Sequence, residues 1–200
     1  MHPSVLEAQL AELLPRHSVM VQESSTARTT LLPFGHHAMG WTRSGGGSLG
    51  FGVGGAIGAK IAVGRERPVV LHLGDGALGY SAAGFWTMAR YNTAILTIVS
   101  NNESYQVVRT NWAREMPDSK MVRDGKYPGL YLSAPAVDYV ALARSQGVAG
   151  ESVTTLKDLE GALRRGVDRI TRENRPYLID VSVTREGVGA DSTWYQDWQL

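Results

Sequence analysis

The stretch from Val69 to Tyr105, VVLHLGDGALGYSAAGFWTMARYNTAILTIVSNNESY, constrains the fold more than any other. An apolar run ends in GDG at residues 74–76, a helical pattern follows, and a second apolar run ends in NN at residues 101 and 102. Two apolar runs joined by one helix predict a pair of parallel strands, buried on both faces. We therefore expect Asp75 and Asn102 to lie at adjacent strand ends.

This pair predicts a site for a hard cation and phosphate. Mg²⁺ prefers a near-octahedral shell of oxygens at about 2.0–2.1 Å and keeps phosphate or water in several positions. Asp75 and Asn102 offer one anionic and one neutral oxygen, and the main-chain carbonyl of Ser104 is a candidate third ligand. The N-terminus of a helix that follows Gly76 and Ala77 would present free N–H donors to a diphosphate. Asn is common in turns, so the prediction depends on the pair and not on Asn102 alone.

The remaining pattern completes an open α/β fold. Strands are expected at 18–22, 69–73, 94–99 and 177–183. Helices are expected at 4–14, from the glycine-rich segment to 63, and at 78–90, 106–112, 139–146 and 156–170. This alternation predicts a doubly wound α/β domain with a mainly parallel sheet and helices on both faces. Residues 31–43 and 114–132 are expected to be irregular. We assign residues 1–185 to the domain and 186–200 to a C-terminal tail.

Composition excludes several function classes. Two hundred residues are enough for one well-buried domain but not for two large ones. A net charge of +1 gives no electrostatic case for a nucleic acid or a membrane surface. The absence of cysteine excludes disulfides, thiolate nucleophiles and sulfur metal sites. No apolar run approaches a transmembrane helix, and the N-terminal pattern is not a signal peptide, so we expect a cytoplasmic protein.

A glycine-rich segment at residues 45–60 raises an alternative. Gly50, Gly52 and Gly55 form G-x-G-x-x-G, and Asp75 lies about twenty residues further on, as in a dinucleotide-binding fingerprint. The fingerprint requires an apolar strand directly before its first glycine, and MGWTRSGGG at 39–47 does not predict one. The acidic residue also lies inside a Gly-Asp-Gly turn. We therefore disfavour a nicotinamide site, and the sequence contains no P-loop.

The motifs resemble those of a known family. GDG at 74–76, with Asn102 following Asp75 by 27 positions, is similar to the thiamin diphosphate signature GDG…NN. The segment GSLG at 47–50 resembles the G-x-[LMI]-G segment of these enzymes, and ESST at 23–26 resembles their phosphate-side strand end. The similarity covers about residues 3 to 185. It is closest to the diphosphate-binding (PP) domain of the benzoylformate decarboxylase and acetolactate synthase group.

The resemblance implies a role for each matching position. Asp75, Asn102 and the carbonyl of Ser104 would hold Mg²⁺. The diphosphate would be contacted by Ser25, Thr26, Gly76 and Ala77. These roles come from the family motif; the residues alone indicate only a cation and phosphate site, and a helix N-cap remains an alternative for the hydroxyls at 24–26.

Further positions would contact the organic part of the cofactor. The carbonyl of Gly47 would accept a hydrogen bond from the 4′-amino group of the aminopyrimidine. Leu49 would force the bent conformation that brings this amine close to C2 of the thiazolium. Tyr80 and Tyr105 lie beside these segments and would line the site. Glu103 stands where relatives often have Gly, so the local geometry after Asn102 is open.

The family also needs a glutamate from a second, pyrimidine-binding domain. Glu23 and Glu103 belong to the phosphate side, and no other stretch here is long enough for that domain. We expect a heterodimer or heterotetramer in which a pyrimidine-binding subunit supplies the glutamate and a 2-oxo acid is decarboxylated or ligated. One alternative is a fragment of a longer single-chain enzyme. Another is a non-catalytic, cofactor-binding subunit with a structural or regulatory role.

Other features leave alternatives open. His36 and His37 lie in a loop, either in contact with substrate or merely solvated. His72 is expected to be a satisfied core histidine. The tail carries Trp194, Tyr195 and Trp198, which pack on their own domain, on a partner or over the site. The sequence leaves the identity of the 2-oxo acid open.

Overall fold

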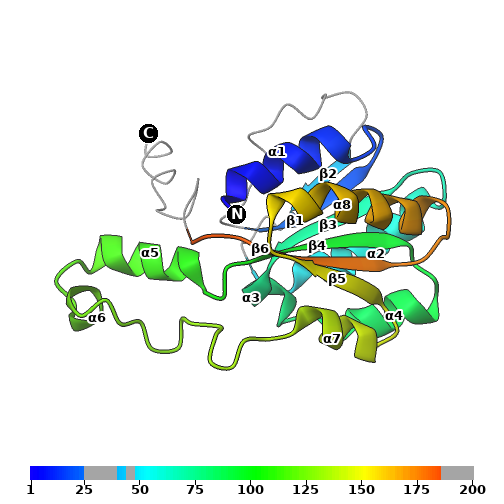
Figure 1. Ribbon diagram of the computed structural model, residues 1–200. Helices are drawn as coiled ribbons and strands as arrows, with labels where there is room; N and C mark the ends of the chain where they lie inside the picture. Colours follow the sequence, from blue (N-terminus) through cyan, green and yellow to red (C-terminus); the bar gives the residue numbers. More distant parts are fainter. Residues whose placement is uncertain (25–39, 44–47, 186–200) are drawn as a thin grey trace, which may run out of the picture.

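The sheet has six strands in the order β2-β1-β3-β4-β6-β5, and every neighbouring pair is parallel (Figure 1). The computed structural model describes the chain except for residues 25–39, 44–47 and 186–200, and gives only the backbone of 40–43. The strands are β1 Val19–Glu23, β2 Gly40–Arg43, β3 Val69–Gly74, β4 Ile95–Asn101, β5 Ala149–Val153 and β6 Tyr177–Ser182. The predicted doubly wound α/β fold is confirmed.

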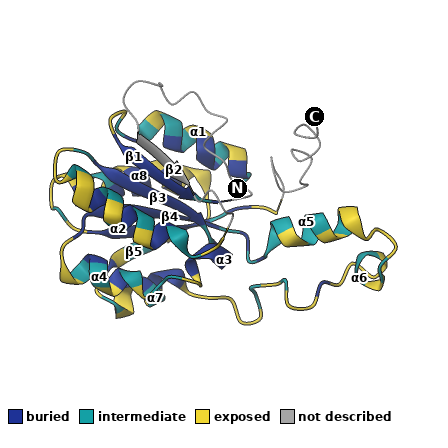
Figure 2. Ribbon diagram, turned by 180° about the vertical axis from the view of Figure 1, so that it is seen from behind, coloured by how far each residue is buried: buried dark blue, intermediate teal, exposed yellow. Residues whose placement is uncertain are grey.

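Helices cover both faces of the sheet (Figures 1 and 2). One face carries α1 Pro3–Leu13 and α8 Leu156–Thr171. The other carries α2 Phe51–Val63, α3 Asp75–Leu78, α4 Gly84–Arg90 and α7 Tyr139–Ser145. Among the described residues, no helix is both long enough and apolar enough to cross a lipid bilayer.

Alternation along β3 fills two cores. Val69, Leu71 and Leu73 are fully buried on the α2 side, whereas Val70 and His72 face the α1 side. Successive side chains of a strand point to opposite faces, and each large apolar side chain contributes about 1.5–3 kcal/mol when fully buried. Because β3 is covered on both faces, nearly all of its residues are apolar, and this continuous apolar run is the pattern that predicted the strand.

His72 lies in the core, as expected, but its Nδ1 has no hydrogen-bond partner in the described structure, so it is only partly satisfied. Its Nε2 lies 2.7 Å from the hydroxyl oxygen of Ser100, and its Nδ1 lies 3.5 Å from a carboxyl oxygen of Glu7 on α1. Burial lowers the pKa of His72 to about 4 and raises that of Glu7 to about 8. Both groups are therefore neutral near pH 7, because neither charge is solvated there.

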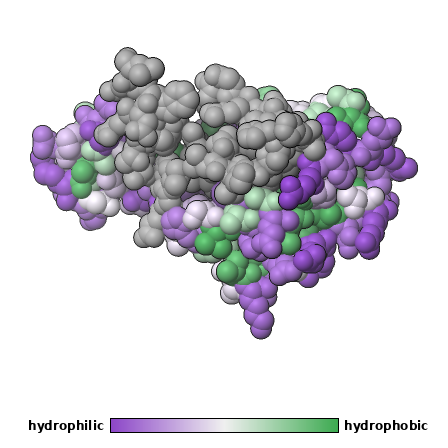
Figure 3. Space-filling view, turned by 90° about the horizontal axis from the view of Figure 1, so that it is seen from above, coloured by the Kyte–Doolittle hydropathy of each residue, from purple (hydrophilic) through white to green (hydrophobic). Residues whose placement is uncertain are grey.

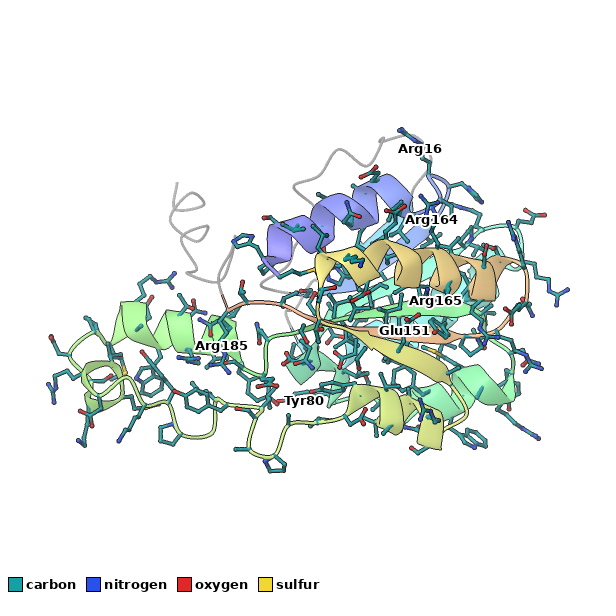
Figure 4. All side chains as sticks on the ribbon, viewed as in Figure 1. Arg16, Tyr80, Glu151, Arg164, Arg165 and Arg185 are labelled. Carbon is teal, nitrogen blue, oxygen red and sulfur yellow. The ribbon has the colours of Figure 1, made fainter. Side chains whose placement is uncertain are left out.

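Helix ends follow the predicted signals. The carboxylate of Asp138 accepts from the N–H of Ala141 at 2.8 Å, and Gly147, with φ of 89°, follows the end of α7. The hydroxyl of Thr155 accepts from the N–H of Asp158 at the start of α8. Each cap satisfies a free helical N–H and contributes about 1 kcal/mol. Surface pairs such as Arg165 with Glu151 contribute less (Figure 4).

Several elements differ from the prediction. The helix expected at 78–90 is instead α3 and α4, separated by the turn at 79–83, whose N–H groups bond three residues back, as in Tyr80 to Ala77 at 3.1 Å. Strand β5 was missed because only Val153 of its five residues is buried. Strand β2 lies where an irregular segment was expected.

Strand β2 also corrects part of the case against a dinucleotide site. A short strand does precede the glycine-rich segment, although residues 44–49 separate it from Gly50. The other part of the argument holds, because Asp75 begins α3 within the Gly-Asp-Gly turn. The strand was missed because it is a four-residue strand at the edge of the sheet, which leaves a weak pattern.

An arm of residues 106–132 projects from the body of the domain (Figures 1 and 2). It contains α5 Gln106–Glu115, which has no buried residue, and α6 Lys120–Arg123, a short helix inside the segment expected to be irregular. Viewed from above, the described part of the molecule is mostly hydrophilic, with small hydrophobic patches (Figure 3). The arm returns beside β4, where Tyr105 N donates to Leu130 O at 3.0 Å and Leu132 N to Glu103 O at 2.8 Å.

Candidate functional site

The candidate site lies at the carboxyl edge of the sheet, at the point where the strand order reverses. After β1 the chain continues to β2 on one side of the sheet, whereas after β3 it continues to β4 on the other side. Open α/β sheets bind ligands at the point between two such strands. An open cavity of about 200 Å³ lies there. The predicted residues that line it are Leu49, Asp75, Gly76, Ala77, Asn102, Ser104 and Tyr105.

Asp75 is the buried anionic group of this cavity. Its Oδ1 accepts from the N–H of Gly76 at 2.9 Å, while its Oδ2 is buried without a hydrogen-bond partner within the described part of the chain. Burial raises the pKa of Asp75 to about 6, and the nearby amides of residues 76 and 102–104 offset part of this rise. A bound cation would stabilise the ionised carboxylate and occupy the free oxygen. The side chain therefore fits the expected metal ligand.

The turn after β4 brings the other expected ligands to Asp75. Asn102 Oδ1 accepts from the N–H of Ser104 at 3.0 Å, which folds the chain into a tight turn. Between them Glu103 has φ of 53°, in the left-handed region that favours glycine. Glycine would adopt this conformation freely, whereas Glu103 adopts it at a cost of about 1–2 kcal/mol.

No group of three His, Asp or Glu side chains lies together as a metal cluster in the described ranges 1–24 and 48–185. The expected ligand set contains one carboxylate, one carboxamide and one main-chain carbonyl, with the remaining positions left to phosphate and water. A Mg²⁺ ion binds in this way when a substrate or cofactor carries the phosphates. The donors at this end of the sheet match that pattern.

Glu23, at the end of β1, anchors the segment that contains Leu49. Its two carboxylate oxygens accept the N–H groups of Gly50 and Gly52, at the start of α2. A Cβ on Gly52 would lie 2.5 Å from Glu23 Oε2, so glycine lets the carboxylate approach. Leu49 directly precedes this anchored turn and remains 37% exposed toward the cavity. Sequence reasoning assigned Glu23 to the phosphate side but missed this contact.

The two tyrosines are placed differently. Tyr105 lines the cavity and packs on Gly76, whereas Tyr80 is 64% exposed, does not line the cavity and lies beside Gly50 (Figure 4). Burial raises the pKa of Tyr105, and the neighbouring Tyr80 side chain adds to this rise. Tyr139 was not predicted: its hydroxyl donates to the carbonyl of Asp75 at 3.1 Å and supports the start of α3.

Several expected site residues lie outside the described residues. They are Ser25, Thr26, His36, His37 and Gly47, together with the tail at 186–200. The first turn of α5 adds cavity-lining residues that the sequence did not single out, namely Gln106, Val107 and Val108. The structure thus gathers the described candidates around one cavity, and their contacts with a cofactor stay a prediction.

The fold and this cavity define a class of protein: a parallel α/β domain that holds its ligand at the carboxyl edge of the sheet. The chain belongs to the thiamine pyrophosphate (thiamin diphosphate) enzymes. Residues 22–181 match the family described as "Thiamine pyrophosphate enzyme, C-terminal TPP binding domain". The resemblance inferred from GDG…NN is confirmed at the level of the family.

Individual relatives agree with this family. The chain is 35% identical over 180 residues to a proposed acetolactate synthase large subunit, IlvX, of Mycobacterium tuberculosis, covering 86% of this chain and 32% of that protein. It is 30% identical over 195 residues to benzoylformate decarboxylase of Pseudomonas aeruginosa, covering 90% and 32%. The structure of a thiamine diphosphate-dependent 4-hydroxybenzoylformate decarboxylase of Rhodococcus jostii matches with a TM-score of 0.75 at 26% identity, covering 92% and 33%. The chain thus spans about a third of the length of these relatives.

Proposed function

We propose that this chain is the diphosphate- and Mg²⁺-binding component of a thiamin diphosphate-dependent 2-oxo acid decarboxylase or carboligase. The observation that carries the proposal is the meeting of Asp75 and Asn102 in one cavity at adjacent strand ends, with one buried oxygen of Asp75 unpartnered in the described structure. The relatives named as benzoylformate decarboxylase and acetolactate synthase support this reaction class.

Each residue of the cavity has a distinct task in this proposal. Asp75, the Asn102 side chain and the Ser104 carbonyl would hold Mg²⁺, and Gly76 and Ala77 would contact the diphosphate. Ser25, Thr26 and Gly47 are assigned from the family motif alone. The described residues of this set follow β3 and β4, so the pairing of these two strands fixes their spacing.

Leu49 supports the organic part of the cofactor. The Glu23 carboxylate anchors the turn after Leu49, so this side chain is held at the cavity by β1 as well as by α2. As the family motif implies, the apolar side chain of Leu49 would press against the cofactor and favour its bent conformation. When bound, thiamin diphosphate would supply a nucleophilic carbon for the carbonyl of a 2-oxo acid and a cationic ring as the electron sink for loss of CO₂.

The activating glutamate is proposed to come from a pyrimidine-binding partner. Glu23 is unsuitable because both of its oxygens accept backbone N–H groups at α2. Glu103 follows the Asn102 ligand position and is part of the metal-binding turn. The relatives are about three times as long as the matched region, which is consistent with a further polypeptide or segment contributing to the site.

Reconstitution tests this proposal. The purified chain is mixed with thiamin diphosphate and Mg²⁺, with and without the pyrimidine-binding product of a neighbouring gene, and CO₂ release from benzoylformate or pyruvate is measured. We expect turnover only with both chains, and none when Asp75→Ala replaces the wild type. Turnover by this chain alone would contradict the partner requirement. Cofactor binding without turnover in any combination would favour the alternative of a non-catalytic subunit.

A further inference from the structure

Asp180 lies on β6, beside the strand that ends in the metal-binding turn. Its backbone is in register with Val99 of β4, and its side chain is 8% exposed. One carboxyl oxygen, Oδ2, accepts from Nδ2 of Asn101 at 3.3 Å. The carboxyl group thus contacts the first Asn of the NN pair, whereas Asn102 is the expected ligand.

The Asn101 carboxamide bridges Asp180 and the turn. Its Oδ1 accepts from the main-chain N–H of Glu103 at 3.1 Å, while its Nδ2 faces Asp180. An amide has one donor end and one acceptor end, so a flipped carboxamide would direct its N–H₂ group at another N–H donor. The carboxyl of Asp180 favours the orientation in which the oxygen reaches Glu103.

Other contacts hold the carbonyl groups of this turn. Arg185 donates to the carbonyl of Asn102 at 3.0 Å and to that of Glu103 at 3.4 Å, and it lies at the base of the arm (Figure 4). Leu132 N donates to the Glu103 carbonyl. The N–H of Glu103, the residue with the left-handed backbone, donates to the side chain of Asn101.

We propose that Asp180 is a positioning residue that, through Asn101, orients the turn carrying the Asn102 side chain and the Ser104 carbonyl. The inference rests on the proposed Mg²⁺ site. In the described structure, the hydrogen bond of Asp180 is to Asn101, which is not one of the proposed metal ligands. Partners that orient metal ligands typically change metal affinity 10- to 100-fold when they are removed.

Three variants separate positioning from general destabilisation. Asp180→Ala removes the acceptor for Asn101. Asp180→Asn keeps an oxygen that can accept the same hydrogen bond. Val181→Ala is the matched control, since Val181 is fully buried on the same strand and packs in the core of the opposite face. Thiamin diphosphate binding is followed by tryptophan fluorescence while Mg²⁺ is titrated. We expect the half-saturating Mg²⁺ concentration to rise at least tenfold in Asp180→Ala, and less than about threefold in Asp180→Asn and Val181→Ala.

A second measurement needs no cofactor. Amide exchange of Glu103 in the metal-free protein is compared among the same variants by NMR, and we expect it to accelerate selectively in Asp180→Ala. If Asp180→Ala leaves both quantities unchanged, or if Val181→Ala shifts them as much, the inference is overturned. If the wild type shows no Mg²⁺-dependent cofactor binding, the proposed function fails instead, and the exchange rates still show whether Asp180 holds the turn.

Discussion

The ring of Tyr105 packs directly on the backbone of Gly76. A Cβ on residue 76 would lie 2.5 Å from Cε1 of that ring and 2.8 Å from Cδ1. Tyr105 directly precedes the arm after β4, and Gly76 lies in α3 directly after β3, so this contact joins the two strand ends of the candidate site. The second glycine of the GDG motif is therefore required by packing.

Gly76→Ala is expected to destabilise the domain by about 1–3 kcal/mol, because the added methyl group forces the Tyr105 ring or the start of α3 to move. Urea denaturation measures this loss. Gly58→Ala, where the added Cβ meets nothing within 4 Å, is the control and should not destabilise. The loss should shrink in a Tyr105→Ala background. An equal loss in both backgrounds would show that the ring is not the cause.

Two glycines of α8 should respond in opposite directions to alanine. A Cβ on Gly166 would lie 2.6 Å from Leu96 and 3.2 Å from Ile179, in a closed core. A Cβ on Gly161 would meet only the exposed, flexible guanidinium of Arg165. We expect Gly166→Ala to lower the unfolding free energy by about 1–3 kcal/mol and Gly161→Ala to raise it by up to about 1 kcal/mol. A gain in stability for Gly166→Ala would contradict the packing of α8 on the sheet.

Glu7 should make stability fall as the pH rises toward 8. An unfolded Glu loses its proton near pH 4.5, whereas burial keeps Glu7 protonated to about pH 8 in the folded chain. The folded state therefore binds more protons between these values. Compared with Glu7→Gln, the wild type should lose about 1–2 kcal/mol between pH 6 and 8.

Denaturation series at several pH values test the prediction for Glu7. Glu12→Gln, on the same helix, is the control, and its stability should follow the wild-type curve. Parallel curves for the wild type and Glu7→Gln would mean that Glu7 is ionised in the folded protein, in a charged pair with His72.

Tyr139→Phe should weaken the support under Asp75. The hydroxyl of Tyr139 donates to the Asp75 carbonyl, which also accepts the N–H of Gly79 at 3.3 Å, so the loss of this buried hydrogen bond should cost about 1 kcal/mol. Thermal denaturation measures this cost, with Tyr91→Phe as the exposed control. Equal melting temperatures for Tyr139→Phe and the wild type would show that this bond does not contribute.

The sequence predicted the elements whose pattern is local. The strands β1, β3, β4 and β6 are buried on both faces and read as apolar runs, whereas β2 and β5 lie at the edges and do not. Because two such runs end in GDG and NN, the meeting of Asp75 and Asn102 was predictable. The break at residues 79–83 was not, since the hydrophobic pattern of a helix continues through that turn.

The contacts that support the site were less accessible to sequence reasoning. Glu23 reaches Gly50 and Gly52 across 27 and 29 positions, and Asn101 reaches Asp180 across 79. No local pattern marks such pairs, because they form only when strands distant in sequence become neighbours in the sheet. An acidic residue at a strand end, followed by a glycine-rich helix start, is the one available signal for Glu23, since a carboxylate favours a helix N-terminus.

Calorimetric titration of this chain with thiamin diphosphate tests the central claim most directly. It is carried out with Mg²⁺ and with excess chelator, on the wild type and on Asp75→Ala. The account predicts saturable, Mg²⁺-dependent binding by the wild type and its loss in Asp75→Ala, while circular dichroism shows that the variant remains folded. Equal binding by a folded Asp75→Ala variant, or by the wild type without Mg²⁺, would contradict the assignment of Asp75 and Asn102 as the metal-binding pair.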